Sequence, residues 1–135
     1  MIEASKSGSG SAVATYGMVG GGPGAFIGEV HRVAARFDGL AALVAGSFSS
    51  RFDKTKQTGG ELGLPADRLY ASYSEMAEKE GSRDDGIDFV VVVTPNKLHY
   101  AIAKAFLENG IHILCDKPLT TTVEEAEALK KIAQD

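Results

Sequence analysis

The chain has 135 residues, enough for one domain with a single sizeable core. Its 14 basic and 18 acidic side chains leave a net charge of −4, and no basic run exceeds Lys130–Lys131. A nucleic acid or an anionic membrane is therefore not an expected partner. No apolar stretch approaches the length of a membrane helix, about 20 residues. The only cysteine, Cys115, excludes an internal disulfide and is typical of a reducing compartment, so we expect a cytoplasmic protein.

The beginning of the chain differs in composition from the rest. Residues 1–15 are mostly small and polar, without periodicity, which predicts a flexible leader. The short apolar run 16–19 is the first strand candidate. We therefore expect one folded domain over residues 16–135.

Strand and helix patterns alternate along this domain. Strands are predicted at 16–19, 43–45, 69–71, 87–93 and 111–115, and helices at 27–37, 53–62, 72–79, 96–109 and 122–135. Ser72 with Glu75 has the spacing of a capping box. Thr122 with Glu125 has the same spacing, and Asn96 is expected to cap the helix that follows it. Such alternation with short connections predicts an α/β fold with a doubly wound parallel sheet.

A glycine-rich segment joins the first predicted strand to the first helix. It reads Val19-Gly20-Gly21-Gly22-Pro23-Gly24-Ala25-Phe26-Ile27-Gly28. Glycines allow backbone N–H groups to approach a pyrophosphate at the positive end of a helix. Gly20 and Gly22 fit the first two positions of the dinucleotide fingerprint, and Gly28 fits the third, which packs the helix. Pro23 and Gly24 lie inside an enlarged loop. Strand, loop and helix in this order predict an NAD(P)-binding Rossmann domain rather than a turn without a ligand.

The end of the second strand bears on the choice between NAD and NADP. An acidic residue about 20 positions after the fingerprint usually holds the ribose 2′-hydroxyl, but the chain offers none there before Asp53. The hydroxyls of Ser49 and Ser50, with Arg51 and Lys54, can instead receive a 2′-phosphate. The predicted cofactor is NAD or NADP, with NADP slightly favoured. Asp53 as a ribose ligand is the alternative.

Two further turns follow later strands, at the sheet edge where open α/β sheets bind their ligands. Thr94-Pro95-Asn96 follows strand 87–93 and is expected to border the cofactor, although a plain helix start also explains it. Asp116-Lys117-Pro118 follows strand 111–115. Lys117 can orient a substrate oxygen or help to move the proton that an alcohol loses on oxidation. A solvated surface charge is the alternative interpretation of this lysine.

The histidines show no metal-ligand spacing, and no metal is expected. His31 is expected to pack against or cap a neighbouring element. His99, near the start of its helix, is a candidate for contact with the cofactor, with placement in the core or on the surface as the alternative. Cys115 is expected to be inert inside its strand.

Three segments together resemble the N-terminal domain of the glucose–fructose oxidoreductase/inositol dehydrogenase/MocA family (Gfo/Idh/MocA). They are residues 19–31, residues 94–99 and residues 110–119. The resemblance implies an NAD(P)-dependent dehydrogenase that acts on a sugar, a cyclitol or a related polyol. It implies that Lys117 is the catalytic lysine of the family's Glu-Lys-Pro motif, which reads Asp116-Lys117-Pro118 here. It also implies cofactor contacts from the glycine loop and from Pro95 and Asn96.

The family carries a C-terminal α/β domain with the substrate pocket and a catalytic histidine, and these 135 residues lack it. We therefore expect the cofactor half of a longer enzyme, which by itself binds the dinucleotide without turnover. The alternatives are a non-catalytic nucleotide-sensing module and another Rossmann enzyme class, such as a methyltransferase. The apolar face of helix 124–135, beside an open sheet edge, predicts a homo-oligomer.

Overall fold

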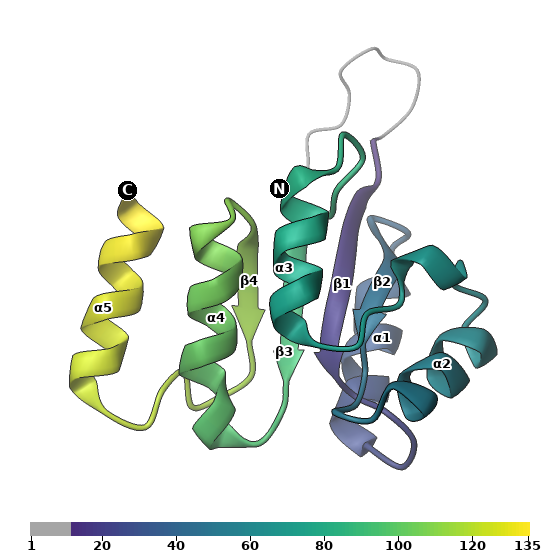
Figure 1. Cartoon of the computed structure of the whole chain (residues 1–135), viewed down its shortest axis with the longest axis horizontal. Helices are drawn as coiled ribbons and strands as arrows, with labels where there is room; N and C mark the ends of the chain where they lie inside the picture. The colour runs from purple at the N-terminus through teal and green to yellow at the C-terminus, as the bar shows by residue number, and fades with distance from the viewer. Residues whose placement is uncertain (1–11) are drawn as a thin grey trace.

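The computed structural model describes residues 12–135 as strands and helices alternating around one parallel sheet (Figure 1). The strands are β1 (Ala14–Gly20), β2 (Ala41–Ser47), β3 (Phe89–Val93) and β4 (His112–Cys115). The helices are α1 (Phe26–Arg36), α2 (Phe52–Glu61), α3 (Tyr73–Ser82), α4 (His99–Glu108) and α5 (Val123–Gln134), with 3₁₀ turns η1 (Ala66–Arg68) and η2 (Asn96–Leu98). Every strand pair is parallel, and the order is β2-β1-β3-β4. The predicted parallel α/β fold is confirmed.

The first strand begins earlier than its sequence pattern predicts. Most of the predicted leader, residues 1–11, lies outside the described residues, but Ala14 and Thr15 already belong to β1. Two main-chain contacts to Asp88 hold this start. The Thr15 N–H donates to the Asp88 carboxylate at 2.8 Å, and the Asp88 N–H donates to the Thr15 carbonyl at 2.8 Å.

The prediction of a strand at residues 69–71 is wrong. The chain makes only one bridge to the sheet there, between Leu69 and Gly46, supported by the Tyr70 N–H donating to the Gly46 carbonyl at 2.9 Å. The 3₁₀ turn η1 ends at Arg68 and the N-cap of α3 is Ser72, so too few residues remain for a longer ladder.

The two predicted capping boxes are confirmed. The Ser72 hydroxyl accepts the Glu75 N–H, and the Thr122 hydroxyl accepts the Glu125 N–H, each at 3.1 Å. The predicted cap at Asn96 is wrong, because that residue begins η2 and α4 starts at His99 without any side-chain cap. Within the described part of the chain, no helix combines the length and apolar character needed to cross a membrane.

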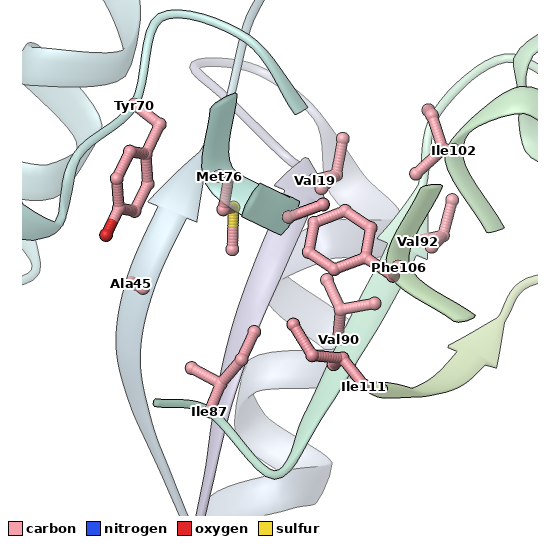
Figure 2. Close-up of a cluster of buried hydrophobic side chains, with 11 residues drawn as sticks. Val19, Ala45, Tyr70, Met76, Ile87, Val90, Val92, Ile102, Phe106 and Ile111 are labelled. Atoms are coloured by element: carbon pink, nitrogen blue, oxygen red, sulfur yellow. The ribbon is translucent and has the colours of Figure 1, made fainter. Parts of the chain in front are cut away.

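The sheet has apolar cores on both faces. One cluster, drawn in Figure 2, joins the sheet to α3 and α4, and it includes Val90 and Val92 of β3. The other cluster includes Val91 and Val93 and packs towards α1 through Ile27. Successive β3 side chains thus point to opposite faces, as expected for a β-branched strand that is covered on both sides.

Large exposed apolar side chains gather on α1, whereas α5 exposes Val123. Helix α5 lies against α4, and its Leu129 is buried, so the apolar face that predicted self-association is partly covered. Helix α1 exposes Phe26, Val30 and Val33, and Phe37 follows at its C-cap, all at helical spacing along one side. A homo-oligomer stays a prediction.

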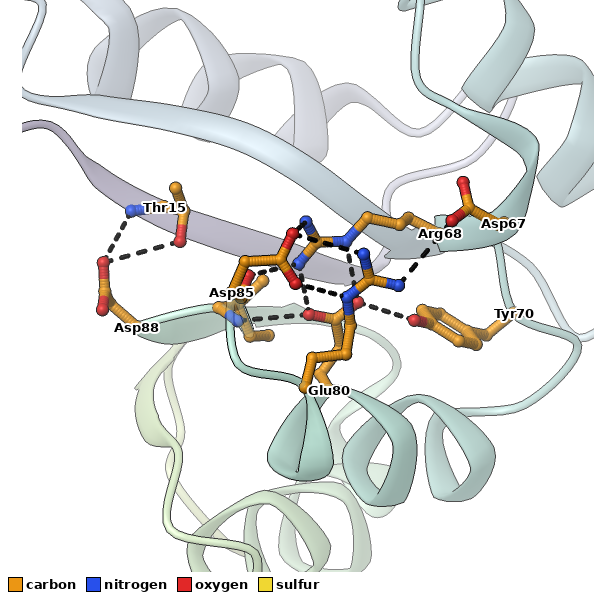
Figure 3. Close-up of polar contacts among 9 residues, drawn as sticks. Thr15, Asp67, Arg68, Tyr70, Glu80, Asp85 and Asp88 are labelled. Atoms are coloured by element: carbon orange, nitrogen blue, oxygen red, sulfur yellow. Dashed lines mark hydrogen bonds and ion pairs between the residues drawn. The ribbon is translucent and has the colours of Figure 1, made fainter.

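The buried carboxylate of Glu80 on α3 links η1, the segment after η1 and the residues just before β3 (Figure 3). The Glu80 side chain accepts hydrogen bonds from Arg68 Nε at 3.0 Å, from the Tyr70 hydroxyl at 2.6 Å and from the Ile87 N–H at 3.1 Å. Burial and the neighbouring Glu80 carboxylate hold the pKa of Tyr70 well above its usual value, so its hydroxyl remains a donor. The Arg68 guanidinium also donates to the Asp85 carbonyl at 3.1 Å.

We expect Glu80→Ala to lower the free energy of unfolding by about 3–5 kcal/mol, because it leaves a buried guanidinium without its carboxylate. The matched control is Lys79→Ala on the same helix, where an exposed pair with Glu75 is lost at a cost of about 0.5 kcal/mol or less. Chemical denaturation followed by circular dichroism measures both. Equal losses in the two variants would contradict the structural role given to Glu80.

Candidate functional site

A cleft of about 720 Å³ lies where β1, β2 and β3 end. Predicted residues from three separate turns line it, namely Gly20, Gly22, Pro23, Ser49, Ser50, Thr94 and Pro95. Sequence reasoning missed other lining residues, among them Ala25, Ser47, Tyr73, Leu98 and Ile102. Their apolar or small side chains carry no motif, and only the fold places them at this edge. The cleft has the position at which open α/β sheets bind ligands.

The glycine loop forms one wall, and its backbone is too close to its neighbours for side chains. Gly20 has φ +91°, and a β-carbon there would lie 2.7 Å from the Val93 carbonyl oxygen. A β-carbon on Gly28 would lie 2.6 Å from the Cα of Gly21, so α1 is held directly against the loop. This agrees with the helix-packing position predicted for Gly28. Gly24, also at positive φ, lies in open space at the turn.

The start of α1 faces this loop without a side-chain cap. The N-cap is Ala25, which lines the cleft and offers no oxygen to the first helical N–H groups. Uncapped N–H groups and the positive end of the helix dipole favour an anion at this place. Together with the glycine loop, they are suited to a pyrophosphate.

The end of β2 corrects one expectation from the sequence. Arg51 is turned to Asp53 at 3.0 Å, both side chains are largely exposed, and neither lines the cleft. Lys54, one turn into α2, lines the cleft beside Ser49 and Ser50. Of the two cations that the sequence suggests, only Lys54 lines the cleft. No acidic side chain lines this end of the cleft among the described residues.

The two later turns lie at the same edge. Thr94 and Pro95 line the cleft, whereas Asn96 is exposed outside its lining. Asp116 continues the sheet through its N–H, which donates to the Val92 carbonyl at 3.0 Å. Lys117 follows directly and is exposed, outside the cleft lining, and its peptide bond to Pro118 is cis.

The histidines contribute contacts that the sequence does not reveal. His31 Nε2 lies 3.8 Å from the Asp116 carboxylate, which links α1 to the end of β4. His99 is buried, with Nδ1 2.7 Å from the Pro118 carbonyl and Nε2 2.9 Å from the Thr94 carbonyl. Its ring therefore has no free nitrogen for a cofactor and does not act as the direct ligand that the sequence suggested. Among residues 12–135, no cluster of His, Cys, Asp and Glu forms a metal site.

Cys115 ends β4 immediately before the Asp116-Lys117-Pro118 turn. Its side chain is half-buried rather than fully buried. Burial, and then the charge of Asp116, raises the pKa of the thiol to about 11. Because only the thiolate is strongly nucleophilic, the folded chain should resist alkylation near neutral pH.

We expect iodoacetamide to alkylate Cys115 about 100-fold more slowly in the folded chain than in urea at pH 8.5, since two pKa units separate the folded and free thiols. The difference should vanish as the pH rises through about 11, where the folded thiol ionises. Mass spectrometry of quenched samples measures the rates. Equal rates at pH 8.5 would show that the thiol is not suppressed.

The fold and the cleft together define a dinucleotide-binding Rossmann domain. The chain belongs to the Gfo/Idh/MocA oxidoreductase family, whose model, described as an oxidoreductase family with an NAD-binding Rossmann fold, matches residues 14–135. The predicted family and the predicted nicotinamide cofactor are thereby confirmed, with the choice between NAD and NADP left open.

Several known proteins are similar to this chain. An uncharacterised oxidoreductase of Bacillus subtilis, YfiI, is 42% identical over 88% of this chain and 30% of its own length. The structure of an inositol dehydrogenase homologue from Azotobacter vinelandii, complexed with NADH and myo-inositol, is 45% identical with a TM-score of 0.88 over 90% of this chain and 32% of that one. The NADP(+)-dependent scyllo-inositol 2-dehydrogenase IolW of Bacillus subtilis is 40% identical over 42% of this chain and 16% of its own length. The chain thus spans about a third or less of the length of these relatives.

Proposed function

We propose that this chain is the cofactor-binding part of a dehydrogenase that oxidises a hydroxyl group of a sugar, a cyclitol or a related polyol with NAD or NADP. The observation that carries the proposal is the single cleft shared by the glycine loop, the end of β2 and the Thr94–Pro95 turn. The inositol substrates in the names of two relatives support the substrate class.

In this proposal, each wall of the cleft binds a different part of the dinucleotide. The loop from Gly20 to Ala25 and the start of α1 would hold the pyrophosphate through backbone N–H groups. Ser49 and Ser50 would hold the adenosine ribose, and Thr94 and Pro95 would border the nicotinamide ring. The bound dinucleotide supplies the hydride acceptor. Lys117 would orient the substrate oxygen and assist the movement of its proton.

Of the two cofactors, we propose NADP as the preferred one. Lys54 lines the end of the cleft next to the two serine hydroxyls, and the nearest carboxylate, Asp53, is neutralised by Arg51. A lysine ammonium and hydroxyl donors suit a 2′-phosphate. The sequence pattern favours NADP for the same reason, with both Arg51 and Lys54 as candidate cations.

We expect Lys54→Ala to weaken NADP binding about tenfold and NAD binding much less, because one charge-assisted contact to phosphate is lost. Arg51→Ala is the matched control, and it should change both affinities little. Titrations of each chain with NADP and with NAD, followed by calorimetry, measure this. Equal weakening of both cofactors by Lys54→Ala, or a larger effect of Arg51→Ala on NADP, would refute the assignment.

We expect Lys117→Met to reduce oxidation of a polyol about 100- to 10,000-fold, as the loss of proton-transfer assistance does, while cofactor affinity changes little. Production of reduced nicotinamide with a panel of sugars and cyclitols measures turnover in the protein that contains this domain. Lys97→Met, on an exposed residue of η2, is the control and should remain active. Dinucleotide binding with no polyol oxidised by the unaltered protein would favour the nucleotide-sensing module instead.

A further inference from the structure

The segment after β4 is joined to the rest of the domain mainly through one buried ring. The main-chain hydrogen bonds of the sheet end at Asp116, whose N–H donates to the Val92 carbonyl. Within residues 12–135, no backbone–backbone hydrogen bond involves Lys117, Pro118 or Leu119. The Pro118 carbonyl is instead 2.7 Å from Nδ1 of His99. The place of this segment therefore depends on a side chain from another element.

The same ring holds the turn that borders the cleft. Nε2 of His99 lies 2.9 Å from the carbonyl of Thr94, at the end of β3. His99 is only 1% exposed, so its ring nitrogens depend on these partners rather than on water. A single rigid imidazole thus spans the turn after β3 and the turn after β4. The ring thus adds a contact between these two turns to those that β3 and β4 make as neighbouring strands.

Carbonyl oxygens only accept hydrogen bonds, so each of these contacts needs a proton on the ring nitrogen. A neutral imidazole donates through one nitrogen, and the doubly protonated ring donates through both. The ring holds the Pro118 carbonyl by a hydrogen bond only when Nδ1 carries a proton. Nδ1 is the nitrogen that faces the Lys117–Pro118 turn.

We propose that His99 is a positioning residue for Lys117. It fixes the Pro118 carbonyl against the Thr94 turn, so that the lysine keeps one place relative to the cleft. The role of Lys117 itself rests on the proposed dehydrogenase function. The position that His99 gives to the Lys117–Pro118 turn does not rest on that function, because it follows from two contacts within the chain.

Two substitutions separate this role from simple filling of space. An asparagine amide nitrogen is as many bonds from the backbone as Nδ1, and a glutamine amide nitrogen is as many as Nε2. His99→Asn therefore keeps a donor for Pro118 and loses the one for Thr94. His99→Gln does the reverse. Each variant removes one of the two part-buried contacts of the ring, so a similar loss of stability is expected from both.

The test measures the fast backbone motion of Lys117 and Leu119 as NMR order parameters, on the chain without dinucleotide. We expect the order parameters to fall below about 0.6 in His99→Gln, and to stay near the rigid value of about 0.85 in His99→Asn. His112→Gln, an exposed histidine on β4, is the control and should leave both order parameters unchanged. An equal drop in His99→Asn and His99→Gln, or none in either, would overturn the proposal.

A second measurement uses the unaltered chain and needs no variant to fold. Two-bond ¹H–¹⁵N spectra show which ring nitrogens of His99 carry a proton. A protonated Nδ1 is expected, and a bare Nδ1 would overturn the proposal. Titration with NADP in the same samples tests the dehydrogenase proposal separately. A chain that binds no dinucleotide, but in which His99→Gln and His99→Asn differ as expected, would refute the proposed function. It would leave the positioning role of His99 supported.

Discussion

The buried Glu80 carboxylate is the interaction on which the rest of the domain depends. It gathers donors from η1, from the segment after η1 and from the entrance to β3, so three elements share one centre. A carboxylate buried at this depth is tolerated only when its oxygens are fully hydrogen-bonded. The position of Ile87 fixes where β3 enters the sheet. Because β3 exits at Thr94, one wall of the cleft is set by the same centre.

The opposite walls depend on close approach rather than on charge. Gly20 lies against the carbonyl of Val93, and Gly28 lies against Gly21, so β1, β3 and α1 meet without intervening side chains. This closeness leaves backbone N–H groups as the available polar surface, which suits a diphosphate better than any side chain would. The cleft therefore combines a backbone wall with small hydroxyl-bearing side chains, among them Ser49 and Ser50.

Local features of the site could be predicted from the sequence, because their partners are a few residues apart. The glycine loop and the capping boxes are of this kind, and so is the order of strands and helices. Glu80 has the pattern of an ordinary residue on a polar helix, and its partner Arg68 is 12 positions away. The contacts of His99 with two turns could not be predicted from the sequence either, since they require β3 and β4 to be neighbours. Arg51 failed as a cleft residue because Asp53, two positions on, is the nearer partner.

Lys54 makes the ribose end of the cleft easy to change in evolution. Its side chain lines the cleft and belongs to neither apolar core, so its loss would leave the sheet intact. The neighbouring charges of Arg51 and Asp53 cancel, and both side chains lie outside the lining. A lineage could therefore exchange the proposed preference for a phosphate ester for one for a bare ribose by a single codon change at Lys54.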